Sequence, residues 1–123
     1  ETDLYRRAGE LKPALAHEEI VALQAEVARV KVDDAVLEYI IRLADATRRD
    51  LVIRLGISPR GALFLFRAAQ ANALADGRDY CTPDDVRAMA VPVYAHRIII
   101  ESNLYGIARI EEGFAHEPYH RSE

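Results

Sequence analysis

The run from Leu55 to Gly61 reads Leu-Gly-Ile-Ser-Pro-Arg-Gly and carries the residues of this chain most able to do chemistry. Ser58 is typical of a helix N-cap and Pro59 of a first helical position, so Arg60 falls in the first helical turn. The helix dipole is positive there, and a cation costs about 0.3–1 kcal/mol unless an anion offsets it. Backbone N–H groups and a guanidinium would together hold a phosphate or a carboxylate. The alternative is that Arg60 is a solvated surface arginine.

Basic residues gather just before this helix start. Arg48, Arg49, Arg54 and Arg60 lie between positions 47 and 60, where Asp50 alone opposes them, although the whole chain has a net charge of −4. A charge run is usually solvated, but this one leads into a helix N-terminus, which favours a surface that faces an anion. The mild negative charge excludes a globally basic nucleic-acid binder and leaves a local basic patch open.

The elements that must position this stretch are predicted to be helices. A chain of 123 residues, half of them hydrophobic, is the size of one domain with one core. Abundant Ala, Leu and Glu with few Gly and Pro predict an all-α fold, a small helical bundle. Apolar periodicity and cap signals place helices over residues 4–11, 17–30, 33–48 and 58–76 and from 82 onward, with Pro92 interrupting the last.

Single residues set the expected helix ends. Asp33 and Thr82 are typical N-caps, Asp85 stands in the reciprocal position of a capping box, and Gly77 is a typical C-cap residue. The 58–76 helix is apolar nearly all the way round, so it is expected to be central, and the apolar stripes of the two preceding helices are expected to be core.

Other residue patterns indicate no further chemistry. The letters H-E-x-x-H occur at 116–120, but Pro118 breaks the helical turn that zinc ligation needs, so no metal site is predicted. Cys81 is the single cysteine and is interpreted as a buried structural thiol. No G-x-x-x-x-G-K-[ST] loop and no strand ending in paired acids is present, so this chain alone is expected to bind and cleave no nucleoside triphosphate.

The cellular context is predicted from absences in the sequence. One cysteine excludes an internal disulfide, no charged-then-apolar leader opens the chain, and the longest apolar run, Ile98–Ile100, is far too short for a membrane span. We therefore expect a cytoplasmic protein. The chain begins one residue before a helix, from which we expect it to be a piece of a longer protein.

Three stretches, in this order and spacing, resemble the C-terminal helical lid of MoxR-type AAA+ ATPases: residues 55–62, 77–86 and 95–97. The resemblance also takes in Tyr39–Leu43 and Thr47–Arg48. It covers roughly residues 17–100. On this resemblance, residues 1–16 are a linker helix from the nucleotide-binding core, 17–100 the lid, and 101–123 a C-terminal extension and tail.

The resemblance implies roles for the residues around the helix start. Arg60 would be the sensor 2 arginine, which contacts the terminal phosphates of ATP bound with Mg²⁺ in the full-length protein. Ser58 and Pro59 would fix the helix start that aims it, and Gly56 would allow a tight approach. Family members are ATP-hydrolysing ring oligomers, commonly hexamers, that act as chaperone-like factors, often on partners with a von Willebrand factor A domain or a metal cofactor.

Some residues depart from the family pattern. Cys81 stands where an aliphatic residue is usual, Gly61 stands where Ala is common, and residues 106–123 follow no clear pattern. These differences leave Arg60 in place.

Two alternatives to the lid remain open on the sequence. One is a stand-alone helical interaction module, because Tyr80–Val86 is also similar to the link into the last helix of histone folds, and the basic run could meet nucleic acid. A steep salt dependence of DNA binding would favour this module. The other is a metal-dependent hydrolase that uses the tail, which predicts stoichiometric zinc.

Overall fold

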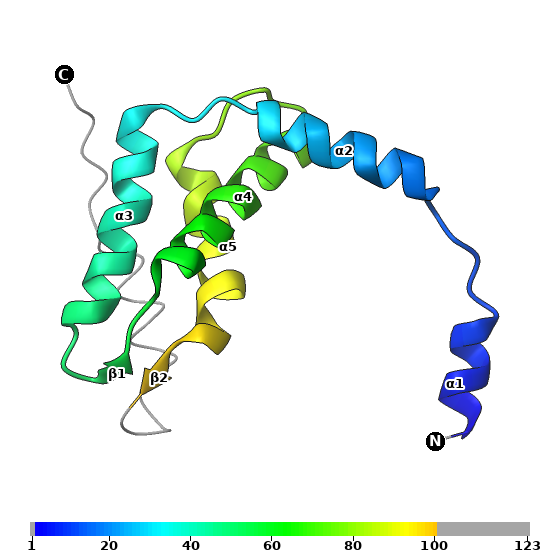
Figure 1. Cartoon of the computed structure of the whole chain (residues 1–123), viewed down its shortest axis with the longest axis horizontal. Coiled ribbons are helices and arrows are strands. Elements are labelled where there is room, and N and C mark those ends of the chain that lie inside the picture. The colour runs from blue at the N-terminus through cyan, green and yellow to red at the C-terminus, as the bar shows by residue number, and fades with distance from the viewer. Residues whose placement is uncertain (1, 101–123) are drawn as a thin grey trace.

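The structure is a computed structural model that describes residues 2–100 of the chain (Figure 1). Its helices are α1 (Thr2–Gly9), α2 (His17–Arg29), α3 (Asp34–Arg49), α4 (Pro59–Ala75) and α5 (Pro83–Tyr94), followed by the 3-10 turn η1 (Ala95–Arg97). Two short strands, β1 (Ile53–Leu55) and β2 (Ile99–Ile100), pair antiparallel. The predicted all-α helical bundle is confirmed. The predicted extension at 101–123, including the letters at 116–120, lies outside the described residues.

Local capping explains where the helices begin. The Asp33 carboxylate accepts a hydrogen bond from the Val36 amide at 2.8 Å, and the Ser58 hydroxyl accepts one from the Gly61 amide at 3.2 Å. The Thr82 amide donates to the Asp85 carboxylate at 2.7 Å, which forms the predicted capping box of α5. Each cap satisfies a backbone or side-chain group that would otherwise lack a partner at a helix start, so the sequence signals were sufficient to locate these ends.

Gly77 ends α4 as predicted, with a positive φ of 78°. Its amide donates to the Leu74 carbonyl at 2.9 Å, and the Arg78 amide donates to the Ala73 carbonyl at 2.9 Å. These two bonds are those of a Schellman motif, in which glycine is favoured because it has no Cβ to resist the left-handed conformation.

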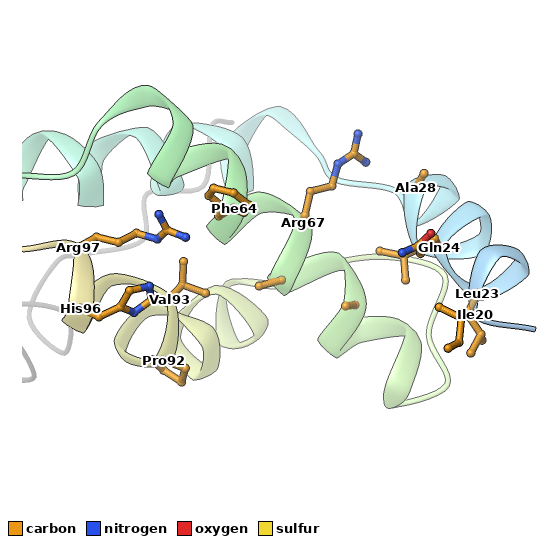
Figure 2. A pocket seen from close by; sticks show the side chains of 13 residues that line it. Ile20, Leu23, Gln24, Ala28, Phe64, Arg67, Pro92, Val93, His96 and Arg97 are labelled. Atoms are coloured by element: carbon orange, nitrogen blue, oxygen red, sulfur yellow. The ribbon is translucent and has the colours of Figure 1, made fainter. Parts of the chain in front are cut away.

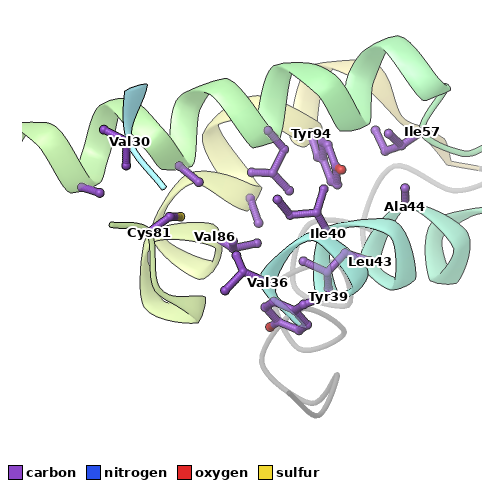
Figure 3. Packing of buried hydrophobic residues seen from close by; sticks show 14 residues of the cluster. Val30, Val36, Tyr39, Ile40, Leu43, Ala44, Ile57, Cys81, Val86 and Tyr94 are labelled. Atoms are coloured by element: carbon purple, nitrogen blue, oxygen red, sulfur yellow. The ribbon is translucent and has the colours of Figure 1, made fainter. Parts of the chain in front are cut away.

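The core lies where α3 and α5 pack against α4, as Figure 3 shows for its larger members. On α4 the buried positions include Leu65, Ala69 and Ala73, and on α5 they include Val86 and Ala90. The small alanine side chains let the two helix backbones approach closely. The predicted central place of α4 is confirmed, since α2, α3 and α5 all contact it.

Two details of the helices differ from the prediction. The predicted apolar stripe of α2 is not core: none of its residues is buried, and Ile20 and Leu23 are 44% and 43% exposed. Periodicity identifies an apolar face but does not say what covers it. Pro92 was also expected to interrupt the last helix, yet α5 continues through it to Tyr94. Pro92 cannot donate to the Ala88 carbonyl, but only Val93 and Tyr94 follow it in α5, so the disturbance is confined to the last turn.

Candidate functional site at the start of α4

The end of α3 holds the residue that precedes the cap of α4. The Ile57 amide donates to the Thr47 hydroxyl at 2.9 Å, and the Thr47 hydroxyl donates to the Ala44 carbonyl at 2.6 Å. The Arg48 Nε donates to the Ile57 carbonyl at 2.8 Å. Ile57 is itself buried in the core. Both backbone groups and the side chain of Ile57 are therefore fixed, and with them the point at which α4 starts.

Gly56 is required by the closeness of this junction. A Cβ at this position would lie 2.8 Å from the backbone N and Cα of Arg48 and 2.8 Å from its Cγ. Ordinary Cβ contacts are longer, so the β1–α4 connection could not lie this close to α3 with a larger residue. The close approach that Gly56 allows in this structure is that of the β1–α4 connection to Arg48 of α3.

Arg60 lies exposed in the first turn of α4, which contains no acidic residue. Within residues 2–100 its side chain makes no hydrogen bond or ion pair. The Ser58 hydroxyl occupies the Gly61 amide. The cation is thus held at the positive end of a helix dipole without an anion from the described part of its own chain.

The basic run divides into arginines with different environments. Arg48 is bonded to the Ile57 carbonyl, and Arg49 pairs with Asp45 one helical turn earlier. Arg54 and Arg60 are exposed and have no ion-pair partner within residues 2–100. The sequence predicted one basic surface that contains all four arginines. In the structure Arg48 instead holds the junction, through its hydrogen bond to Ile57, nine residues further along the chain.

A second guanidinium lies close to this helix start. The Arg97 guanidinium lies over the Phe64 ring, 4.3 Å from its centroid, and the Arg97 Cδ lies 3.7 Å from the Cβ position of residue 61 (Figure 2). The sequence predicted no role for Arg97 beyond its place in the 95–97 stretch. Its contact with α4 could not be predicted, because it depends on how η1 packs against the bundle.

A polar cluster fixes the opposite end of α4. Arg78 donates to both oxygens of Asp85, at 2.8 and 2.6 Å, and Asn72 donates to Oδ1 at 2.8 Å. The Asp85 side chain is 1% exposed. The Arg78 guanidinium, with Thr82 and Asn72, holds the pKa of this carboxyl well below its usual range, while burial acts in the opposite direction. The carboxylate is fully engaged, so the cluster is structural.

Cys81 lies beside this cluster and is also structural. The thiol is buried, as predicted, and burial raises its pKa to about 12. A thiol with so high a pKa is protonated near neutral pH and is a poor nucleophile.

Within residues 2–100, His, Cys, Asp and Glu side chains do not gather into a group of three or more that could hold a metal ion. No helix within those residues combines the length and the apolar character needed to cross a membrane.

Comparison with known proteins relates this bundle to lid domains. The sequence profile described as "AAA lid domain" matches residues 45–112. The chain is 41% identical over 99 residues to the uncharacterized protein YeaC of Bacillus subtilis, covering 79% of this chain and 31% of YeaC. It is 35% identical over 103 residues to protein MoxR of Methylorubrum extorquens, covering 79% and 29%. It is 32% identical over 98 residues to chaperone MoxR1 of Mycobacterium tuberculosis, covering 72% and 26%.

A solved structure agrees with these relatives. A "putative ATPase" from Cytophaga hutchinsonii superposes with a TM-score of 0.65 at 28% identity, covering 76% of this chain and 32% of that one. The chain spans about a third of the length of the proteins it matches. It belongs to the AAA lid domain family and is the helical lid of a MoxR-type AAA+ protein.

Proposed function

We propose that this lid serves an ATP-hydrolysing AAA+ protein and that Arg60 is its sensor 2 arginine. In this role Arg60 contacts the terminal phosphates of a nucleotide held by the core domain. The observation that carries the proposal is the placement of Arg60: exposed in the first turn of α4, without an anion from residues 2–100. A phosphate at that position would offset both the guanidinium and the helix dipole.

The junction between α3 and α4 supports this role because it sets the direction of Arg60. Thr47 and Arg48 hold Ile57, Ser58 caps the helix, and Pro59 follows in the first helical position. A preorganised cation loses little reorganisation energy when charge develops on a phosphate, which is the main advantage of fixed electrostatic groups. ATP with Mg²⁺ would supply the phosphoryl group, and the lid would supply a cation carried on a fixed stretch of backbone.

The same junction would link the nucleotide to motion of the whole lid. Because Ile57 belongs to the buried hydrophobic core, a force on Arg60 would be passed to the bundle. In this proposal residues 1–16 connect the lid to the core domain, and residues 101–123 extend beyond it. Neighbouring subunits of a ring, commonly a hexamer, and a client bearing a von Willebrand factor A domain complete the chaperone-like cycle. In this proposal the full-length protein acts in the cytoplasm.

Mutation of the full-length protein tests the role of Arg60. Arg60→Ala should lower steady-state ATP turnover at least tenfold, since a hydrogen bond to a charged group contributes about 1.5–3 kcal/mol. Arg54→Ala is the matched control, because Arg54 is a nearby exposed arginine outside the helix start. Circular dichroism would show that both variants fold. If Arg60→Ala retains both the turnover and the nucleotide affinity of the unaltered protein, Arg60 is not sensor 2.

A further inference from the structure

One face of α4 is left open as the floor of a groove. α2 forms one wall, and the end of α5 with η1 forms the other (Figure 2). The groove has a volume of about 760 Å³. This volume is within the range of about 300–1,000 Å³ that is usual for concave binding sites, and it has room for several side chains.

The groove is lined mainly by apolar side chains that nothing in residues 2–100 covers. Ile20 and Leu23 of α2 are 44% and 43% exposed, and Phe64 of α4 is 47% exposed. Ile20 and Leu23 are three residues apart and so lie on the same helix face. An open apolar face between two walls is the kind of surface that receives the apolar stripe of an additional helix.

The charged side chains of the groove are all basic. Arg67 and Arg97 line it, and no Asp or Glu does, although the chain has 20 acidic residues. Within residues 2–100 neither arginine forms an ion pair. The groove therefore combines an apolar floor with two cations that lack anions.

Both arginines are held in place by other contacts. Arg67 donates to the side-chain oxygen Oε1 of Gln70 at 3.1 Å, and the side-chain Nε2 of Gln70 donates to the Val30 backbone carbonyl at 2.8 Å. Arg97 lies over the Phe64 ring, and its buried Nε has no hydrogen-bond partner within the described residues. A buried donor without a partner costs stability.

We propose that this groove binds an acidic amphipathic helix of a partner protein. Apolar residues of that helix, spaced i, i+3 or i+4 and i+7, would pack on Ile20, Leu23 and Phe64. Carboxylates flanking the apolar stripe would pair with Arg67 and Arg97, in the fork geometry that guanidinium groups favour. The phosphates of a nucleic acid could pair with the two arginines, but they have no apolar face to cover the rest of the groove. The inference does not depend on the role of Arg60.

Peptide binding to the full-length protein, without nucleotide, tests the proposal. The probe is a fluorescein-labelled 16-residue helical peptide with leucines at i, i+3, i+7 and i+10 and glutamates beside them. Fluorescence anisotropy should show saturable binding, and ¹⁵N-labelled protein should show shifts in α2, α4 and η1. Arg67→Glu and Leu23→Asp should each raise the dissociation constant at least tenfold.

Matched controls separate the groove from general surface effects. Arg29→Glu makes the same charge change at the exposed end of α2 outside the groove, and Leu37→Asp alters a 41% exposed leucine on α3. Both should bind the peptide as the unaltered chain does. A lysine-for-glutamate version of the peptide should bind at least tenfold more weakly.

Several results would overturn the proposal. These are an absence of peptide binding, equal binding of the lysine peptide, and equal losses in the groove and control variants. Binding of a 20-base-pair DNA duplex that Arg67→Glu abolishes and the peptide fails to displace would instead make the groove a phosphate-binding surface. Because no nucleotide is present in these measurements, their failure would leave the proposed role of Arg60 untouched.

Discussion

Asp85 shows how much a single buried residue can contribute to this fold. Its carboxylate receives hydrogen bonds from Arg78, Asn72 and Thr82, which come from the turn after α4, from α4 itself and from the start of α5. The sequence predicted only the bond with Thr82, because a capping box is local. Arg78 and Asn72 were missed because only the folded chain brings them to the same carboxylate.

Removal of this carboxylate should destabilise the bundle strongly. We expect Asp85→Ala to lower the free energy of unfolding by about 3 kcal/mol, near the lower end for breaking a buried ion pair, since Arg78 can still reach water. Asp84→Ala is the control, because Asp84 is the exposed neighbour in the same helical turn and should cost less than about 1 kcal/mol. Urea denaturation measures both values. Equal losses in the two variants would contradict a special role for Asp85.

The same residue should make stability depend on acid pH. The pKa of Asp85 is lowered in the folded state, chiefly by Arg78, whereas an unfolded Asp titrates near about 3.9. Its stabilisation is therefore fully present above about pH 4 and is lost progressively as the pH falls below that value. Thermal unfolding between pH 2 and 7 should show a smaller decline for Asp85→Asn than for the unaltered chain. Parallel curves for the two proteins would show that Asp85 is not responsible.

Among the elements, the contact between the end of α3 and the start of α4 decides where Arg60 lies. Gly56 permits it, and we expect Gly56→Ala to lower the free energy of unfolding by about 1–3 kcal/mol, because the new methyl group would overlap the backbone of Arg48. Gly9→Ala is the matched control, since a Cβ there meets nothing within 4 Å. Thermal or urea denaturation would measure the difference. An unchanged midpoint for Gly56→Ala would mean that the junction can relax without cost.

Helix positions were predictable to the extent that local chemistry sets them. Asp33, Ser58, Thr82 and Gly77 each mark a helix end by a hydrogen bond or a backbone conformation that depends on neighbouring residues alone. The pairing of β1 with β2 could not be predicted in the same way, because its partners are far apart in sequence. The burial predicted for the apolar stripe of α2 was wrong, because the spacing of apolar residues does not show whether another element packs on them.

For the whole molecule, the motif resemblance and the fold point to the same family from different directions. The 55–62, 77–86 and 95–97 stretches lie far apart in the sequence, yet in the structure they form the start of α4, the link into α5 and η1. The first and last meet where Arg97 comes close to the position of Gly61. Their order and spacing are thus consequences of one packed bundle.

In the proposed function the start of α4 faces the terminal phosphates of a nucleotide, which a comparison of two nucleotides tests. In the full-length protein, Arg60→Ala should weaken binding of a non-hydrolysable ATP analogue about tenfold or more, because one charge-assisted hydrogen bond is lost. Its affinity for ADP should change much less, and Arg54→Ala should change neither affinity. Calorimetric titration of the unaltered protein and of both variants with each ligand gives the six dissociation constants. Equal losses for ADP and the ATP analogue, or no loss for either, would show that Arg60 does not contact the terminal phosphate.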